Sequence, residues 1–250
     1  MAIVWQKQVG GTRYEVRMAG RTRRLYTDGV FHSQFNPDQP VSGSIWDLLM
    51  LPAFFYPKGK IQRILVLGVG GGAVMQQFQH FLKPVHITGV ELNPYHLYVA
   101  RRFFYVKQDN VDLYLEDAVQ WVKEYDGEKF DLIVDDLFGE EDGEPVRAVE
   151  ADGKWFRKLL KLLNKDGALV SNFVSGREFK KCAYFTDTKI KKQFKSVFQF
   201  TAPHYENTIG AFLKIDANQQ TLKQNLIDTP QLNPTLKSSR LRYSVRRLFA

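Results

Sequence analysis

Several residue types that define whole classes of protein are scarce in this 250-residue chain. Its one cysteine, Cys182, excludes a disulfide framework and any zinc or iron–sulfur site built from several thiolates. The longest apolar run, residues 48–56, contains a proline and is much shorter than the roughly 20 residues of a membrane-spanning helix. No basic start followed by a long apolar stretch marks a signal peptide. We therefore expect a soluble, cytoplasmic protein with no membrane partner.

Catalytic motifs of metalloenzymes and hydrolases are also missing. The five histidines form neither an HxH nor an HExxH pattern, so we expect no bound metal. No GxSxG motif marks a nucleophilic serine. Residues 125–129 have the YxxxK spacing of some reductases, but the glycine among them favours a turn. The chemistry must come from other residues.

The formal net charge of +8 suggests a polyanionic partner such as nucleic acid. However, the basic residues gather near the two ends of the chain, away from the motifs described below. They are Arg13, Arg17, Arg21, Arg23 and Arg24 early, and Lys237, Arg240, Arg242, Arg246 and Arg247 late. A nucleic-acid partner is therefore the less favoured interpretation.

From residue 63 onward, apolar strands alternate with helical patterns. The expected strands are residues 64–67, 86–90, 111–115, 130–134 and 168–173. Continuous apolar runs of this kind are typical of strands covered on both faces, and repeated strand–helix units predict a parallel sheet. Two later strands, 196–201 and 210–215, are joined too closely for a crossover helix and predict an antiparallel pair at the edge. The fold class is α/β, with a Rossmann-like, doubly wound, mostly parallel seven-stranded sheet.

The pattern divides the chain into three parts. Residues 1–52 predict a small N-terminal β-domain followed by a connecting helix, because alternating segments at 12–18 and 23–27 are separated by turn signals. Residues 53–216 form the Rossmann-like domain, which contains the strand–helix alternation. Residues 217–250 are a basic tail of uncertain structure.

A glycine-rich loop follows the first strand of the large domain. Gly68, Gly70, Gly71 and Gly72 precede a helical pattern, so main-chain amides there can approach a ligand closely. The alternative is a simple tight turn between strand and helix. In a doubly wound sheet, ligands bind at the carboxyl ends of the strands, which favours a nucleotide site.

Acidic residues follow the next strands at the same edge. Glu91 ends the second strand and can accept hydrogen bonds from two ribose hydroxyls, although a helix cap or a solvated charge is the alternative. Asp117 and Ala118 follow the third strand, where the carboxylate and the next amide can contact adenine; Asp is equally a good helix cap. Both interpretations of Asp117 stay open.

Two adjacent acids, Asp135 and Asp136, follow the fourth strand. A carboxylate at this position can attract a cationic amine or accept its proton before attack. Repulsion between neighbouring acids can raise one pKa. The alternative is a solvated acidic loop that continues through residues 140–142.

Together, these motifs resemble the spermidine synthase (polyamine aminopropyltransferase) family, within the S-adenosylmethionine-dependent methyltransferase superfamily. The resemblance covers the glycine loop, the motifs at 90–94 and 116–118, the strand ending in Asp135, and the segment 203–210, whose Tyr205 resembles a tyrosine lining the amine site. It implies a homodimer, adenosine bound by residues matching Glu91, Asp117 and Ala118, and catalysis by Asp135.

The chain departs from the family pattern at several positions. The family has an amine-holding Asp where this chain has Gly71, and its Y-H-E motif is reduced here to an acid, Asp47. Its second acid after the fourth strand is lost, although the adjacent Asp136 remains a candidate substrate contact. The donor-contacting Gln has an approximate counterpart in Gln34. Loss of charged anchors, each contributing about 1.5–3 kcal/mol, weakens a specific diamine site.

The hypothesis from sequence is a spermidine synthase-like transferase that binds S-adenosylmethionine and alkylates, chiefly methylates, an unidentified small acceptor such as an amine. The first alternative is a polyamine aminopropyltransferase that uses decarboxylated S-adenosylmethionine. A catalytically inactive nucleotide-binding relative is the second, and a nicotinamide dehydrogenase the third. In the transferase reading, Tyr205 forms a wall of the catalytic site.

Overall fold

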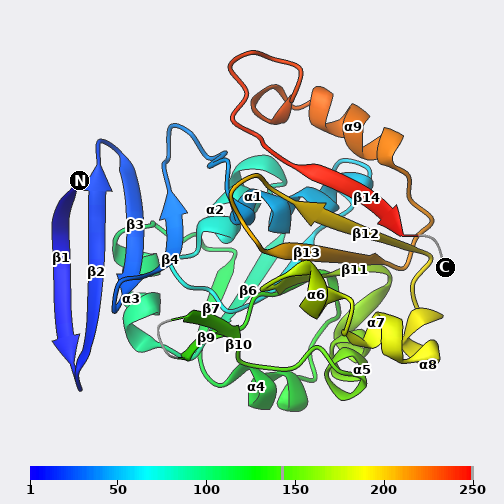
Figure 1. Ribbon diagram of the computed structural model, residues 1–250, viewed down its shortest axis with the longest axis horizontal. Coiled ribbons are helices and arrows are strands. Elements are labelled where there is room, and N and C mark those ends of the chain that lie inside the picture. The colour runs from blue at the N-terminus through cyan, green and yellow to red at the C-terminus, as the bar shows by residue number, and fades with distance from the viewer. Residues whose placement is uncertain (142–143, 249–250) are drawn as a thin grey trace.

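The computed structural model describes residues 1–141 and 144–248. Its N-terminal part is a four-stranded antiparallel sheet in the order β1-β2-β3-β4, drawn in blue in Figure 1. The strands are β1 (Ala2–Val9), β2 (Thr12–Ala19), β3 (Thr22–Thr27) and β4 (Val30–Phe35). The segments expected at 12–18 and 23–27 are therefore present as β2 and β3, and β1 and β4 complete the expected N-terminal β-domain.

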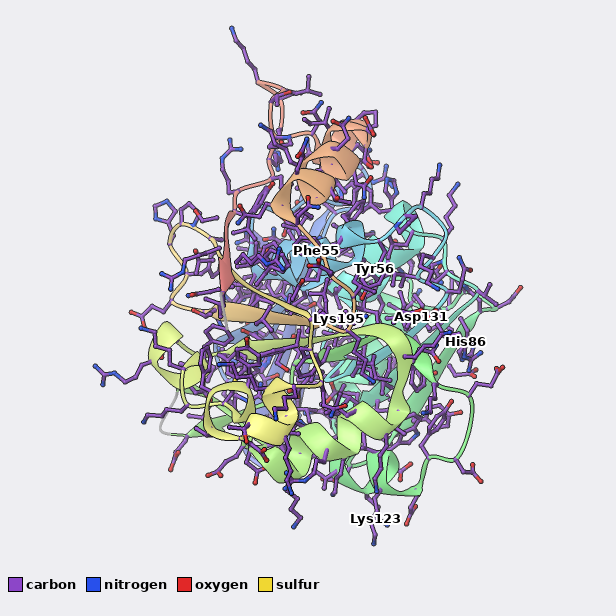
Figure 2. The ribbon with its side chains drawn as sticks, turned by 90° about the vertical axis from the view of Figure 1, so that its right-hand side faces the viewer. Phe55, Tyr56, His86, Lys123, Asp131 and Lys195 are labelled. Atoms are coloured by element: carbon purple, nitrogen blue, oxygen red, sulfur yellow. The ribbon has the colours of Figure 1, made fainter. Side chains whose placement is uncertain are left out.

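A short helical segment connects this sheet to the rest of the chain. It consists of α1 (Ile45–Met50) and a 3₁₀ turn, η1 (Leu51–Phe55), which has Pro52 in its first turn. Proline is tolerated there because its missing N–H would have no helical partner. Phe55, labelled in Figure 2, stacks on Phe198 of the large sheet at a centroid distance of 4.2 Å, which fixes the segment there.

The large sheet has eight strands in the order β14-β12-β13-β11-β8-β5-β6-β7. The four strand contacts from β11 to β7 are parallel, and the three from β14 to β11 are antiparallel. The strands are β5 (Arg63–Leu67), β6 (His86–Glu91), β7 (Val111–Leu115), β8 (Phe130–Asp135), β11 (Leu163–Phe173), β12 (Ser196–Thr201), β13 (Thr208–Leu213) and β14 (Ser244–Leu248). The predicted α/β fold with a mostly parallel sheet is confirmed.

Helices cover both faces of this sheet (Figure 1). One face packs against α1, η1 and three further helices, and the opposite face packs against the remaining five. The first group is completed by α2 (Ala73–Phe81), α3 (Pro94–Arg102) and α9 (Gln219–Ile227). The second consists of α4 (Ala118–Glu124), α5 (Gly153–Leu162), α6 (Gly176–Phe179), α7 (Ala183–Thr186) and α8 (Thr188–Lys191).

Local signals explain where these helices begin. Asn93 caps α3 by accepting from the main-chain N–H of Tyr95 at 2.9 Å, and Pro94 occupies the first helical position. Asp152 caps α5 in the same way, through the N–H of Trp155 at 2.7 Å. The buried residues of α5 lie at helical spacing, which is why the sequence pattern predicted this helix.

Residues beyond 216 form more structure than a tail. They contribute α9, a 3₁₀ turn η2 (Pro230–Leu232) and β14, which adds an eighth strand to the seven expected. Asn225 on α9 donates to the main-chain oxygen of Phe54 at 2.7 Å. The three-part division of the chain remains a prediction, but its last part packs on the main sheet.

Two predicted strand boundaries shift, and one hairpin was not predicted. β11 begins at Leu163 rather than at residue 168, with an irregularity in its pairing between Leu163 and Ala168. β13 spans Thr208–Leu213 rather than residues 210–215. The hairpin of β9 (Phe138–Glu141) and β10 (Glu144–Arg147) was expected only as an acidic loop. Among the described residues, none of the helices is both long enough and apolar enough to cross a membrane.

Candidate functional site

The glycine loop lies between β5 and α2, at the carboxyl end of the central strand. Gly68, Gly70 and Gly72 have φ angles of +85°, +53° and +81°, a left-handed conformation that favours glycine. A Cβ added to Gly68 would lie only 2.2 Å from the main-chain oxygen of Asp136. The glycine loop and the loop after β8 are therefore in direct main-chain contact.

Gly71 is closely packed on its side-chain face. A Cβ there would lie 2.8 Å from the ring of Phe104 and 2.8 Å from the Cβ of Ser33. At Gly70, a Cβ would lie 3.3 Å from the main-chain oxygen of His32. Strand β4 thus covers the glycine loop, and the space where a larger residue at position 71 would extend is filled by protein.

Glu91, at the end of β6, is 8% exposed and organises this loop. Its Oε2 accepts from the main-chain N–H of Gly70 at 2.8 Å, and its Oε1 from that of Asn93 at 2.9 Å. Burial acts to raise the pKa of Glu91, but His96 and the two amides outweigh it, so that the pKa is lowered. Each oxygen of this ionised carboxylate keeps capacity for a second hydrogen bond, as a ribose diol requires.

Two histidines lie beside Glu91. His96 Nδ1 is 3.7 Å from Glu91 Oε1, and His96 Nε2 lies 2.9 Å from the hydroxyl of Thr27. The ring of His32 lies 4.8 Å from that of His96, centroid to centroid. Sequence reasoning missed both histidines, because their spacing matches no motif. His96 lies near Glu91 in the first turn of α3, whereas His32 is brought there by strand β4 of the N-terminal sheet.

Asp117 lies where the sequence placed it, just before α4. Its Oδ1 accepts from the main-chain N–H of Gln120 at 2.9 Å, so it acts as a helix N-cap. Asp117 is exposed and Ala118 is buried. The cap uses one carboxylate oxygen, and a contact with adenine remains a prediction.

The two acids after β8 have different environments. Asp135 is 0% exposed and pairs with Arg147 at 2.8 Å. Asp136 is only partly buried, and its Oδ1 accepts from the side chain of Asn172 at 2.8 Å. Burial, with a further contribution from Asp135, raises the pKa of Asp136 to about 6 against the lowering effects of Asn172 and Arg147. Of the two, Asp136 is the acid that a ligand can reach.

The partners of these acids were not predicted. Arg147, on β10, also donates to the main-chain oxygens of Val149 and Asn172. Asn172, at the end of β11, accepts from the side chain of Asn207 at 3.1 Å. This polar cluster connects three chain segments beneath Asp136. Of the predicted acidic run at 140–142, Glu140 and Glu141 lie in β9, and Asp142 falls outside the described residues.

Tyr205 lies near Ser44 and Asp47, at the start of α1. Burial raises the pKa of Tyr205, and Ser44 and the charge of Arg24 oppose that rise. Gln34 on β4 accepts from Arg24 Nε at 2.6 Å. Arg24 is therefore a neighbour of both predicted residues, since it bonds with Gln34 and its charge acts on Tyr205.

Asp47 is fully buried in α1 and bonds only within the protein fold. Its carboxylate accepts from the N–H groups of Ser42 and Gly43, and from the side chain of Gln77 at 2.6 Å. Burial raises its pKa, and these hydrogen bonds oppose the rise. This geometry favours a structural role in the loop before α1 over the predicted contact with substrate.

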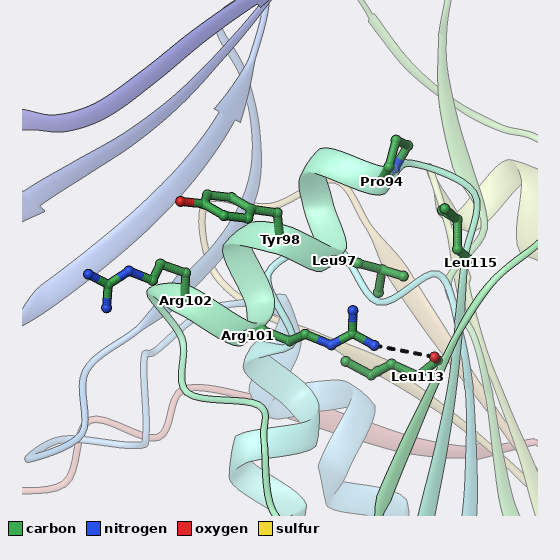
Figure 3. Close-up of a pocket in the computed structure, with 7 residues that line it drawn as sticks. All are labelled: Pro94, Leu97, Tyr98, Arg101, Arg102, Leu113 and Leu115. Carbon is green, nitrogen blue, oxygen red and sulfur yellow. Dashed lines mark hydrogen bonds between the residues drawn. The ribbon is translucent and has the colours of Figure 1, made fainter.

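A cavity of about 510 Å³ opens between α3 and the outer strand β7, away from the residues predicted for catalysis (Figure 3). Arg101 crosses it and donates to the main-chain oxygen of Leu113 at 3.5 Å. The cavity contains no carboxylate and no predicted site residue. It is lined by Pro94, Leu97, Tyr98, Arg101, Arg102, Leu113 and Leu115.

Comparison with known proteins gives a consistent result. Residues 47–225 match the spermine/spermidine synthase domain. A polyamine aminopropyltransferase of Vibrio vulnificus is 28% identical over 170 residues, covering 66% of this chain and 55% of that protein. The chain thus spans little more than half the length of the curated relatives it matches.

Solved structures support the fold. A probable spermidine synthase from Corynebacterium glutamicum matches with a TM-score of 0.75 and 16% identity, covering 98% of this chain and 91% of the other. Spermidine synthase from Thermotoga maritima matches with a TM-score of 0.65 and 12% identity, covering 94% and 79%. At these identities, the likeness concerns the fold alone.

Proposed function

Because the chain belongs to the spermine/spermidine synthase family, we propose that it is a transferase that moves an alkyl group from an adenosyl sulfonium donor to a small amine. One observation carries this proposal: the ionised carboxylate of Glu91 is bonded to the glycine loop, which in turn abuts Asp136. A group suited to a ribose and a group suited to a proton therefore flank one loop at the carboxyl ends of the strands.

The favoured donor is decarboxylated S-adenosylmethionine, and the transferred group is aminopropyl. Supporting this choice, the curated relatives with significant similarity are called polyamine aminopropyltransferases. The favoured acceptor class is a polyamine or its diamine precursor. Glu91 would hold the ribose, Asp117 and Ala118 the adenine, and the glycine loop the sulfonium end of the donor.

The donor supplies a carbon that is already electrophilic, since it is attached to a sulfonium. The acceptor nitrogen forms a bond to that carbon while the carbon–sulfur bond breaks, and the electron pair goes to sulfur as a neutral thioether. The chain aligns the two reactants and excludes water. Asp136, rather than Asp135, is the proposed base for the amine proton, because Asp135 is fully buried and paired with Arg147.

One observation favours a second candidate, methyl transfer from S-adenosylmethionine. Position 71 carries no carboxylate, and Phe104 and Ser33 fill the space in which one would extend. A donor amine therefore has no acid at this position to bind it. The same donor site with an intact methionine end would then serve as a methyl donor site.

Calorimetry with both donors separates the candidates. Aminopropyl transfer predicts that decarboxylated S-adenosylmethionine binds at least tenfold more tightly. Incubation with a panel of diamines and polyamines should then release methylthioadenosine, detected by mass spectrometry. Two results together would favour the second candidate. They are tighter binding of the carboxylated donor, and a product about 14 mass units heavier than its acceptor, which is the mass that methylation adds. Absence of binding by either donor would refute both.

A further inference from the structure

His32 occupies an irregular position in the N-terminal sheet. Pairing between β3 and β4 runs from Leu25 opposite Ser33 directly to Tyr26 opposite Phe31. His32 is therefore the extra residue of a β-bulge, left without a partner on β3. Bulges redirect a side chain relative to the regular alternation, and they are frequent beside active sites. Here the bulge places the imidazole against His96.

The Nε2 atom of His32 is buried and has no hydrogen-bond partner among the described residues. A buried polar atom without a partner destabilises the fold unless a ligand pairs with it. Burial, with help from His96, lowers the pKa of His32 to about 4, so the ring is neutral near pH 7. A neutral imidazole offers one donor and one acceptor nitrogen, either of which suits a hydroxyl.

His32 lies beside the residues of the proposed ribose site. The main-chain oxygen of His32 lies 3.3 Å from the position of a Cβ on Gly70, whose N–H binds Glu91. The neighbouring His96 already has a partner in Thr27 through Nε2 and approaches Glu91 through Nδ1. His32 is thus the ring beside Glu91 whose buried nitrogen has no protein partner in the described part of the chain.

We propose that His32 is a second ribose-binding residue, whose Nε2 forms a hydrogen bond with one hydroxyl of the sugar that Glu91 holds. The inference rests on the proposed function, because it requires an adenosyl ligand in this site. It extends the donor site to the N-terminal sheet and makes β4 part of it. A sheet outside the nucleotide-binding fold then contributes directly to nucleotide recognition.

A purely structural role for His32 predicts different behaviour. If the ring serves only to pack against His96, replacing it with another ring of similar shape leaves nucleotide binding unchanged. Removing an unpaired buried nitrogen should then leave stability equal or higher. The variant His32→Phe keeps an aromatic ring and removes both nitrogens, so it separates the two roles.

The test is calorimetry of the full chain with adenosine, 2′-deoxyadenosine and 3′-deoxyadenosine. We expect His32→Phe to bind adenosine roughly tenfold more weakly, as the loss of one neutral hydrogen bond implies. The wild type should lose affinity for each deoxy compound. One of the two deoxy compounds lacks the hydroxyl that His32 contacts. His32→Phe should bind that compound with the same affinity as it binds adenosine. Its melting temperature should be no lower than that of the wild type.

The matched control is His86→Phe, because His86 lies at the opposite end of β6 and pairs only with Asp112. This control should bind all three nucleosides as the wild type does. Unchanged adenosine affinity in His32→Phe, or an equal loss for all three nucleosides, would overturn the role of His32. If Glu91→Ala abolishes binding while His32→Phe does not, only this inference fails. Absence of any binding to the wild type refutes the proposed function itself.

Discussion

Asp135 and Asp136, two adjacent acids at the end of β8, have different surroundings. Asp135 is fixed by a buried arginine, whereas Asp136 is a partly buried residue that bonds with Asn172 and has a raised pKa. The sequence could place an acid at this strand end, but not choose between the two. Which of the two acids is paired depends on Arg147, and Arg147 lies on a hairpin that no sequence pattern predicted.

Replacing Asp136 tests its proposed role as the base. Asp136→Asn should lower turnover by about 10²–10⁴-fold, as removal of a general base typically does, and leave donor affinity within a few-fold. In the wild type, turnover should fall as the pH drops below about 6, where Asp136 gains a proton. The exposed Asp126→Asn is the control. Unchanged turnover in Asp136→Asn would remove this residue from the mechanism.

The raised pKa of Asp136 also affects stability. Its folded-state pKa of about 6 exceeds the ordinary 3.8, so the folded protein binds this proton more tightly than the unfolded chain. Asp136 therefore contributes to the free energy of unfolding below pH 4. This contribution, up to roughly 3 kcal/mol, is lost as the pH rises to 6 and above. Urea unfolding between pH 4 and 7 should show that the free energy of unfolding depends differently on pH in the wild type and in Asp136→Asn. The same pH dependence in both proteins would contradict this prediction.

At the scale of elements, the parallel strands were predictable and the β9–β10 hairpin was not. Strands such as β5 and β8 are continuous apolar runs with a single favourable environment. The hairpin contains Gly139 and Pro145 within an acidic stretch, and it is anchored through one arginine rather than through an apolar face. β14 was missed for a related reason: its arginines obscure an edge strand that pairs through its main chain.

The anchor of the hairpin gives a test by double substitution. Arg147→Met should destabilise the protein by about 3–5 kcal/mol, because it leaves Asp135 charged and buried without a partner. Adding Asp135→Leu should recover most of that loss, since replacing both members of a buried pair by apolar residues is often neutral. Urea unfolding of the two single variants and the double variant measures the coupling. Additive losses would show that the pair does not interact.

The packing of the glycine loop against β4 gives a second test at this scale. Gly71→Ala and Gly71→Asp should each lower stability by roughly 1–3 kcal/mol, because the added Cβ would meet Phe104 and Ser33. Gly139→Ala is the matched control, since a Cβ there meets nothing within 4 Å. Thermal unfolding reports all three. A gain in affinity of Gly71→Asp for decarboxylated S-adenosylmethionine would show that this position is not closed.

For the whole molecule, the C-terminal part belongs to the main sheet. Leu222, Leu226, Leu232 and Leu241 are all buried, and β14 covers the edge of β12. A chain ending at residue 216 should therefore expose this apolar surface and an open strand edge, and it should aggregate or lose cooperative unfolding. Light scattering and thermal unfolding check this. If the truncated chain is monomeric and its melting temperature is unchanged, residues 217–250 are a tail, as the sequence suggested.

The contact between Gly68 and the main chain of Asp136 has a consequence for how acceptor choice can change. Asp136 N–H also donates to the oxygen of Leu67 at 2.9 Å, so the separation between the donor loop and the proposed base is set by backbone on both sides. Substitution of the surrounding side chains leaves that backbone spacing unchanged. Evolution or engineering towards a bulkier acceptor must therefore act on the walls around Tyr205, while the spacing of the reacting centres stays constant.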